Sequence, residues 1–194
     1  MNVKVRLACL IALFVSGAVQ AQQKLDSLLV YGDNFIFSFK EPDGWVTDTE
    51  HATEYQANAL LYPKSQSWQN ADGMIRIRVN GKTDENVEKD VAADMSDYRQ
   101  HFATIQFRDI AVSHPTCHVF PKVFFVKNTF YEYVTYVNPG PQSALMFSVS
   151  MNKQKTEATQ SELTAFQKVI SSLNMLKAPR PNVRADEAAA QPQH

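Results

Sequence analysis

The residue types best suited to chemistry lie in one short segment, His114-Pro115-Thr116-Cys117-His118. Two imidazoles and a thiolate could together bind zinc or copper. Pro115 disfavours a helix, and on an extended strand the two histidines lie about 13 Å apart at about 3.3 Å per residue, with the thiol facing the other way. Only a tight turn would gather His114, Cys117 and His118 into a metal site. The alternative is a loop-to-strand junction with Cys117 buried.

Two arginines are the candidates for binding a partner. Arg76 and Arg78 alternate with Ile75, Ile77 and Val79, and this period of two predicts a strand with both guanidinium groups on one face. On an uncovered face they could hold an acidic partner or an anionic headgroup. The alternative interpretation is an ordinary solvated outer face.

Aromatic side chains at alternating positions of later predicted strands form a third candidate group. They could line a cavity for a small apolar ligand, or they could form the hydrophobic core. The group consists of Phe124, Phe125, Phe130, Tyr131, Tyr133 and Tyr136.

The sequence contains no recognisable catalytic or cofactor motif. Gly-x-Ser-x-Gly is absent, as is the Asp-x-Asp-x-Asp-Gly spacing of a calcium loop. Six glycines in the whole chain leave no Gly-rich loop for phosphate. We therefore predict that the protein is not an enzyme, with no catalytic residues and no cofactor.

Hydrophobic periodicity predicts an α+β fold. Short strands are expected at 28–31, 35–39, 57–62, 74–79, 105–113, 117–126, 129–137 and 144–151. A helix is predicted over 84–102, capped by Thr83 or Asp84, and a second helix begins at the capping box Thr159-x-x-Glu162. Asn138-Pro139-Gly140-Pro141 suits a type II turn, so the strands on either side should pair antiparallel.

The first 21 residues have the pattern of a secretory signal peptide. Lys4 and Arg6 precede the apolar run Leu7 to Val15, which is too short to span a bilayer, and cleavage is expected near Ala21. This predicts an extracytoplasmic protein, in the bacterial periplasm or secreted. Removal of the leader takes Cys9 with it, so the mature chain should contain no internal disulfide.

The remaining sequence predicts a single domain over 22–176 and a disordered tail over 177–194 that is rich in alanine and proline. The formal net charge of the whole 194-residue chain, −1, is not the footprint of a nucleic-acid-binding protein. No second segment approaches transmembrane length.

Several short motifs follow an order that resembles the PsbP-like superfamily, over about residues 28 to 175. They are Phe35-Ile36-Phe37-Ser38-Phe39 with Pro42-x-Gly44-Trp45, Ile75-x-Ile77-x-Val79, Tyr131-Glu132-Tyr133-Val134-Thr135-Tyr136, Phe147-Ser148-Val149-Ser150, and Phe166-x-x-Val169-Ile170-x-Ser172-Leu173. The superfamily includes the extrinsic PsbP subunit of the photosynthetic oxygen-evolving complex, nuclear import regulators that bind the Ran GTPase, and DcrB-like envelope proteins.

The resemblance implies an antiparallel sheet of six to seven strands between helices, used as a binding module. Gly44 would permit a turn and Trp45 would anchor it in the core. No position matches a metal-ligand motif of the photosynthetic subunit, and export is incompatible with nuclear import. The expected function is non-catalytic binding of a protein partner or envelope component. The alternatives are a small apolar-ligand carrier or a metal-site protein at His114, Cys117 and His118.

Overall fold

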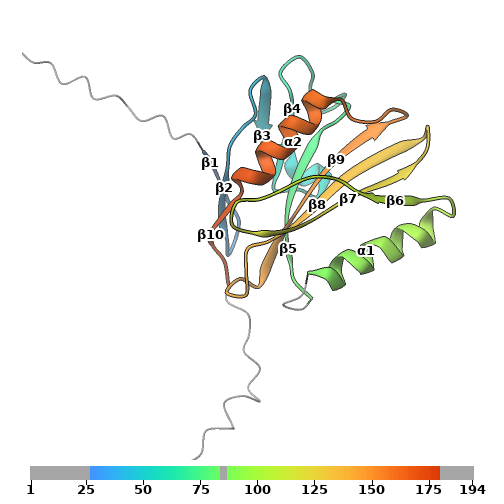
Figure 1. Cartoon of the computed structure of the whole chain (residues 1–194). Coiled ribbons are helices and arrows are strands. Elements are labelled where there is room, and N and C mark those ends of the chain that lie inside the picture. The colour runs from blue at the N-terminus through green and yellow to red at the C-terminus, as the bar shows by residue number, and fades with distance from the viewer. Residues whose placement is uncertain (1–26, 84–86, 180–194) are drawn as a thin grey trace, which may run out of the picture.

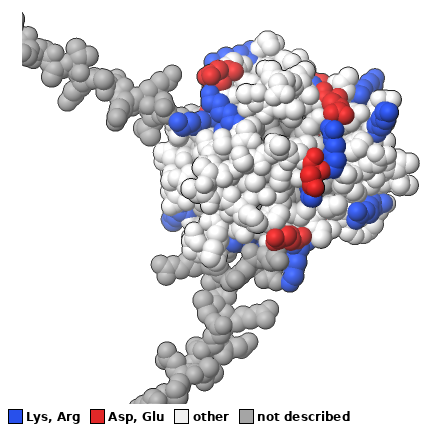
Figure 2. Space-filling view, viewed as in Figure 1, with Lys and Arg blue, Asp and Glu red and all other residues white. Residues whose placement is uncertain are grey.

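The computed structural model describes residues 27–83 and 87–179. The predicted signal peptide and all but the first few residues of the predicted tail lie outside this part of the chain. No helix in the described residues is long and apolar enough to cross a membrane. On the face shown in Figure 2, acidic and basic side chains are interspersed around a broad area that bears few charges.

A seven-stranded antiparallel sheet forms the centre of the fold (Figure 1). Its order is β3 (Trp45–Asp48), β4 (Ala59–Pro63), β5 (Ile75–Gly81), β9 (Leu145–Gln154), β8 (Phe130–Asn138), β7 (His118–Val126) and β6 (Gln106–Asp109). Strands next to each other in this order pair antiparallel with continuous registers, for example Arg76 opposite Ser150 and Glu132 opposite Asn152. The six strands predicted for this part of the chain are present, although β6 is shorter than the predicted 105–113, and β3 was not predicted.

A second sheet of three strands joins the two ends of the described chain. β1 (Leu28–Tyr31) and β2 (Ile36–Phe39) correspond to the first two predicted strands and pair antiparallel as a hairpin, and β10 (Asn174–Lys177) pairs antiparallel with the other edge of β2. β10 was not predicted from the sequence, and it ends at the residue where the tail was expected to begin. The Phe37 ring contacts Phe147 of β9 edge-on, with 5.3 Å between centroids, so the small sheet packs onto the large one.

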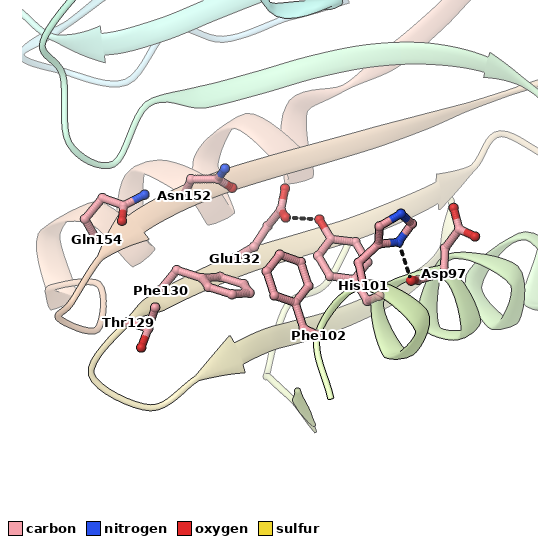
Figure 3. Close-up of a pocket in the computed structure, with 9 residues that line it drawn as sticks. Asp97, His101, Phe102, Thr129, Phe130, Glu132, Asn152 and Gln154 are labelled. Carbon is pink, nitrogen blue, oxygen red and sulfur yellow. Dashed lines mark hydrogen bonds between the residues drawn. The ribbon is translucent and has the colours of Figure 1, made fainter. Parts of the chain in front are cut away.

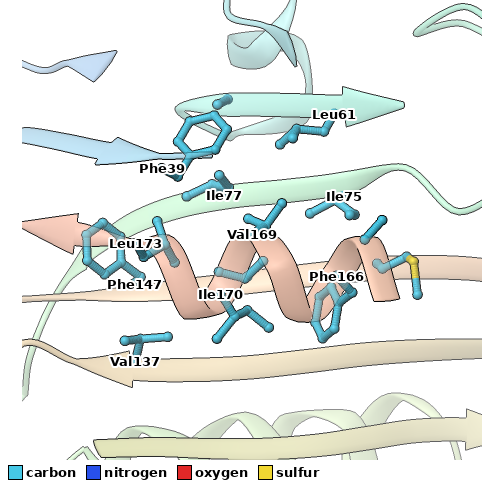
Figure 4. Close-up of a cluster of buried hydrophobic side chains, with 14 of the residues drawn as sticks. Phe39, Leu61, Ile75, Ile77, Val137, Phe147, Phe166, Val169, Ile170 and Leu173 are labelled. Atoms are coloured by element: carbon cyan, nitrogen blue, oxygen red, sulfur yellow. The ribbon is translucent and has the colours of Figure 1, made fainter. Parts of the chain in front are cut away.

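The helix α2 (Gln160–Ser172) covers one face of the large sheet (Figure 4). The predicted capping box is present, because the Glu162 amide donates to Thr159 Oγ1 while the Thr159 amide donates to the Glu162 carboxylate. Its side chains Phe166, Val169 and Ile170 are fully buried against Ile75, Ile77, Val137 and Phe147 from the sheet. Full burial of a side chain of this size contributes about 1.5–3 kcal/mol.

The helix α1 (Glu88–His101) lies on the opposite face of the sheet. Val87, Val91 and Met95 pack against the α1-facing side chains of β8 and β9, which include Tyr136 and Met146. The predicted N-terminal cap is not confirmed for Thr83, whose hydroxyl donates instead to the Asp90 carboxylate, and Asp84 lies outside the described residues. The α+β class with helices on both faces of a seven-stranded sheet is thus confirmed.

Two turns show how the local sequence directs the chain. Gly44 has φ +80°, as the third position of a type II turn requires, and the Trp45 amide donates to Pro42 O across it. Trp45 is buried in the core, as predicted. Between β8 and β9 the hydrogen-bonded turn runs from Gly140 to Ser143 and not from Asn138 to Pro141, because a proline has no N–H to close a turn ending at Pro141.

Candidate functional site

Two adjoining hollows lie on the α1 side of the large sheet, and together they form a groove. The first has a volume of about 400 Å³ and lies beside the C-terminal end of α1. The second has a volume of about 330 Å³ and lies beside the loop 65–73 and the short helix η1 (Ala52–Tyr55). Asn152 and Gln154 of β9 line both hollows, so the two adjoin at this strand.

Aromatic rings from α1 and β8 form the first hollow (Figure 3). The helix ends at His101, and Phe102 then adopts an extended conformation while its amide donates to Tyr98 O. The Phe102 ring lies 6.1 Å from Tyr98 and 5.0 Å from Phe130, measured between centroids. It is 42% exposed, although an aromatic ring of this size is usually buried. An open apolar surface therefore faces the groove.

A buried carboxylate joins the two hollows. Glu132 lines the first hollow and Arg76 the second. The Arg76 guanidinium donates to Glu132 Oε1 at 2.8 Å, and the Tyr98 hydroxyl donates to Oε2. Burial raises the pKa of Tyr98, and the adjacent negative charge of Glu132 adds to this, so the phenol keeps its proton. Both Glu132 oxygens are thereby committed to holding α1 and β5 together.

Beside the second hollow, His51 stacks on Trp68 with centroids 4.3 Å apart. His51 Nδ1 lies 2.9 Å from Asp48 Oδ2, and this hydrogen bond raises the pKa of His51 above its ordinary value. The Tyr55 hydroxyl donates to Trp68 O at 3.0 Å. These contacts attach the loop 65–73 to η1 and hold it as a wall of the hollow.

The two arginines predicted to bind a partner both lie on the α1-facing side of β5. Arg76 is mostly buried in its pair with Glu132. Arg78 Nη2 donates to Tyr55 O at 3.1 Å, whereas its Nε is buried without a hydrogen-bond partner, and burial lowers the pKa of this guanidinium. Arg76 therefore lines the second hollow, whereas Arg78 lies on the same face of β5 and lines neither hollow, and the role of both side chains in binding a partner stays a prediction.

The predicted metal-site residues lie in the segment that connects β6 to β7, and His118 is the first residue of β7. His114 Nδ1 accepts from the amides of Thr116 and Cys117, at 3.1 and 2.8 Å, and Nε2 donates to Leu173 O at 2.8 Å. His118 is exposed and lies edge-on to Phe120. Both ring nitrogens of His114 are thus hydrogen-bonded to backbone groups. Within residues 27–83 and 87–179, no three His, Cys, Asp or Glu side chains are placed to hold a metal ion.

Most of the aromatic group predicted from the strands is core. Phe124, Tyr133 and Tyr136 are fully buried. The Tyr136 hydroxyl donates to Asp94 Oδ2 at 2.5 Å, and burial raises the pKa of this phenol, as does the carboxylate. Phe130 is the member of the group that lines the first hollow.

Sequence reasoning did not identify Phe102, Asn152 and Gln154 as site residues. The signal that could have found the amides is the alternation of β9, where Ser148, Ser150, Asn152 and Gln154 interrupt a run of apolar residues. Because β9 pairs with β5, this polar face continues into Arg76 and Arg78. Polar residues on the helix-facing side of a sheet indicate a part of that side that the helix does not cover.

The architecture defines the class of protein, namely an α+β domain with helices on both faces of an antiparallel sheet. No protein-family model matches the chain, and no curated protein matches it. The chain is similar to the solution structure of cyanobacterial PsbP (CyanoP) from Synechocystis sp. PCC 6803, with 11% sequence identity and a TM-score of 0.45. The match covers 79% of this chain and 95% of that chain. A similarity of this size is not evidence of a shared function.

Proposed function

We propose that the protein is a non-catalytic binding module of the cell envelope or exterior, and that the groove beside α1 holds a protein partner or envelope component. One observation carries this proposal. Asn152 and Gln154 present exposed amides between two hollows lined by aromatic rings. Apolar surface flanked by a few well-placed polar groups is the usual composition of a binding site.

The hydrogen bonds of the groove support binding over catalysis. Glu132 accepts from Arg76 and Tyr98, and His101 Nδ1 bonds to Asp97 O at 2.8 Å. A general base must be within hydrogen-bond reach of the proton that it removes. Here Glu132 uses both carboxylate oxygens to position the walls of the groove.

The location and the ancestry of the protein are part of the same proposal. The basic, apolar and small-residue segments of residues 1–21 support export. The order of short motifs along the chain supports distant membership of the PsbP-like superfamily, in which the groove would serve a binding role.

A carrier of a small apolar ligand is the second candidate. The first hollow measures about 400 Å³ and exposes Phe102 beside Phe130. This volume lies within the range of ordinary small-molecule sites. Native mass spectrometry of protein purified from its own host should then show a bound lipid or pigment, whereas a consistently bare chain would remove this candidate.

Site-specific photo-crosslinking in the original host tests the main proposal. Benzoylphenylalanine placed at Gln154, in the groove, should yield a defined crosslinked species. The matched control places it at Thr164, which is exposed on α2 at the opposite face of the sheet. The Gln154 product should disappear when Phe102→Ala is added. Equal products at both positions, or a product at Thr164 alone, would contradict the proposal.

A further inference from the structure

We infer that the first hollow binds an arginine or lysine side chain that projects from an extended segment of a polypeptide partner. This inference rests on the proposed function, because it names the chemistry of the occupant of the same groove. It follows from the charge of the hollow, from its exposed aromatic surface and from the amides along its floor.

The charge of the hollow is negative. Asp97 and Glu132 are among its lining residues, which include no lysine or arginine. The Glu132 charge is already balanced by Arg76. Asp97 is exposed, and its carboxylate makes no ion pair with any residue that the structure describes. One uncompensated carboxylate therefore lies at the rim and attracts a cation.

The aromatic surface favours the same kind of ligand. Phe102 is 42% exposed and lies 5.0 Å from Phe130, so both rings form one apolar wall of the hollow, and Asp97 lies on the far side of His101 in the same lining (Figure 3). A guanidinium or ammonium group is attracted to the face of an aromatic ring, while the aliphatic part of the same side chain covers apolar surface. An arginine or lysine satisfies the rings and the carboxylate together.

The amides of β9 indicate that the occupant is a polypeptide. Asn152 and Gln154 lie two residues apart on the same face of the strand, and both side chains are exposed. No residue in the described part of the chain forms a hydrogen bond with either side-chain amide. Each amide offers a donor and an acceptor, as does each peptide unit of an extended chain. The two amides can therefore hold a main chain while its basic side chain enters the hollow.

Two short blocked peptides test the inference with NMR titration of the isotope-labelled full chain. The first is acetyl-glycyl-arginyl-glycine amide, and the second replaces arginine by citrulline, which has nearly the same shape without the charge. The arginine peptide should shift the amide signals of Phe102, Phe130, Asn152 and Gln154, and it should bind at least about fivefold tighter than the citrulline peptide.

Paired variants locate the effect. Asp97→Asn should lower the affinity for the arginine peptide toward that for the citrulline peptide, and the attraction of the guanidinium to the aromatic rings should account for the difference that remains. Asp33→Asn changes an exposed aspartate in the turn between β1 and β2, and it should leave the affinity unchanged. Dispersed spectra of both variants will show that they fold.

Equal affinities for the two peptides, or shifts outside the groove, would overturn the inference. The proposed function fails separately, when the crosslinking experiment shows no preference for the groove. A crosslinked partner segment without any basic residue would leave the proposed function standing and refute the inference.

Discussion

Arg76 of β5 and Glu132 of β8 form an ion pair across the strand that separates them. The Arg76 Nη2 and Glu132 Oε1 atoms lie 2.8 Å apart, and β9 runs between the two strands in the sheet. The side chains are 16% and 12% exposed. The pair therefore crosses the floor of the groove and keeps its two hollows in a fixed arrangement.

Replacement of Glu132 should destabilise the fold strongly. Glu132→Ala leaves the Arg76 guanidinium mostly buried without its counter-charge and also removes the acceptor of the Tyr98 hydroxyl. Loss of one partner of a buried pair costs about 3–5 kcal/mol, and the residual exposure places the expected loss near the lower end. Urea denaturation gives the free energy of unfolding that checks this value.

The matched control for this prediction is Glu157→Ala. Glu157 pairs with Arg108 at 2.6 Å, but the two side chains are 52% and 43% exposed. A pair so open to water contributes about 0–1 kcal/mol. Similar losses for Glu132→Ala and Glu157→Ala would show that the pair in the groove is not held as described.

Stability should depend on pH through His51. Its pKa is raised above 6.5, mainly by the hydrogen bond to Asp48, so the folded state holds the proton more tightly than the unfolded state. This contribution is complete below the ordinary pKa and is lost as the pH rises through the raised one. The loss in free energy of unfolding caused by His51→Gln should thus be larger at pH 5.5 than at pH 8.5.

Asp48→Asn provides the counterpart measurement, since it removes the partner that raises the pKa of His51. Its difference from the wild type should show the same direction of pH dependence over this range. If the free energies of unfolding of the wild type and of His51→Gln changed with pH in parallel, folding would not raise the pKa of His51.

The cap of α2 should be a local source of stability. Thr159→Ala removes the hydroxyl that accepts from the Glu162 amide. Loss of an N-cap of this kind costs about 1 kcal/mol. Thr164→Ala is the control in the same helix, because the Thr164 hydroxyl is exposed and only donates to Gln160 O, and it should cost less than about 0.5 kcal/mol. Thermal unfolding distinguishes the two variants.

The predicted signal peptide determines which residue should be the N-terminus of the mature protein. Intact-mass analysis and N-terminal sequencing of protein recovered from the periplasm or culture medium should show a chain beginning at or near Gln22. A full-length chain that remains in the cytoplasm would contradict the predicted signal peptide.

Most of the fold could be predicted because its elements have strong local signals. β5 alternates apolar and basic residues over Ile75 to Val79, and α2 begins at a complete capping box. β10 could not be predicted in this way, because only three of its residues pair with β2 and this partner lies at the other end of the described chain. A pairing between distant segments depends on the assembled core, and it leaves no periodic signal.

The groove was less accessible to sequence reasoning than the sheet. Arg76 was identified on its strand, but its partner Glu132 sits among the aromatic residues of β8, where packing dominates the pattern. Phe102 fits the apolar stripe of the predicted helix, yet the helix ends one residue earlier and leaves the ring exposed. Sites assembled where several elements end depend on those boundaries, which are the least regular part of a sequence pattern.

The pairing of β10 with β2 has a consequence for biosynthesis. Because the chain is synthesised from its N-terminus, Phe37 and Phe39 are made early, yet Asn174 to Lys177 complete their sheet only after nearly all of the described chain has been made. Until then the β1–β2 hairpin presents an open edge and an apolar face. Synthesis therefore includes an interval in which this hairpin is a target for chaperones and proteases, and the interval ends when the last strand is released.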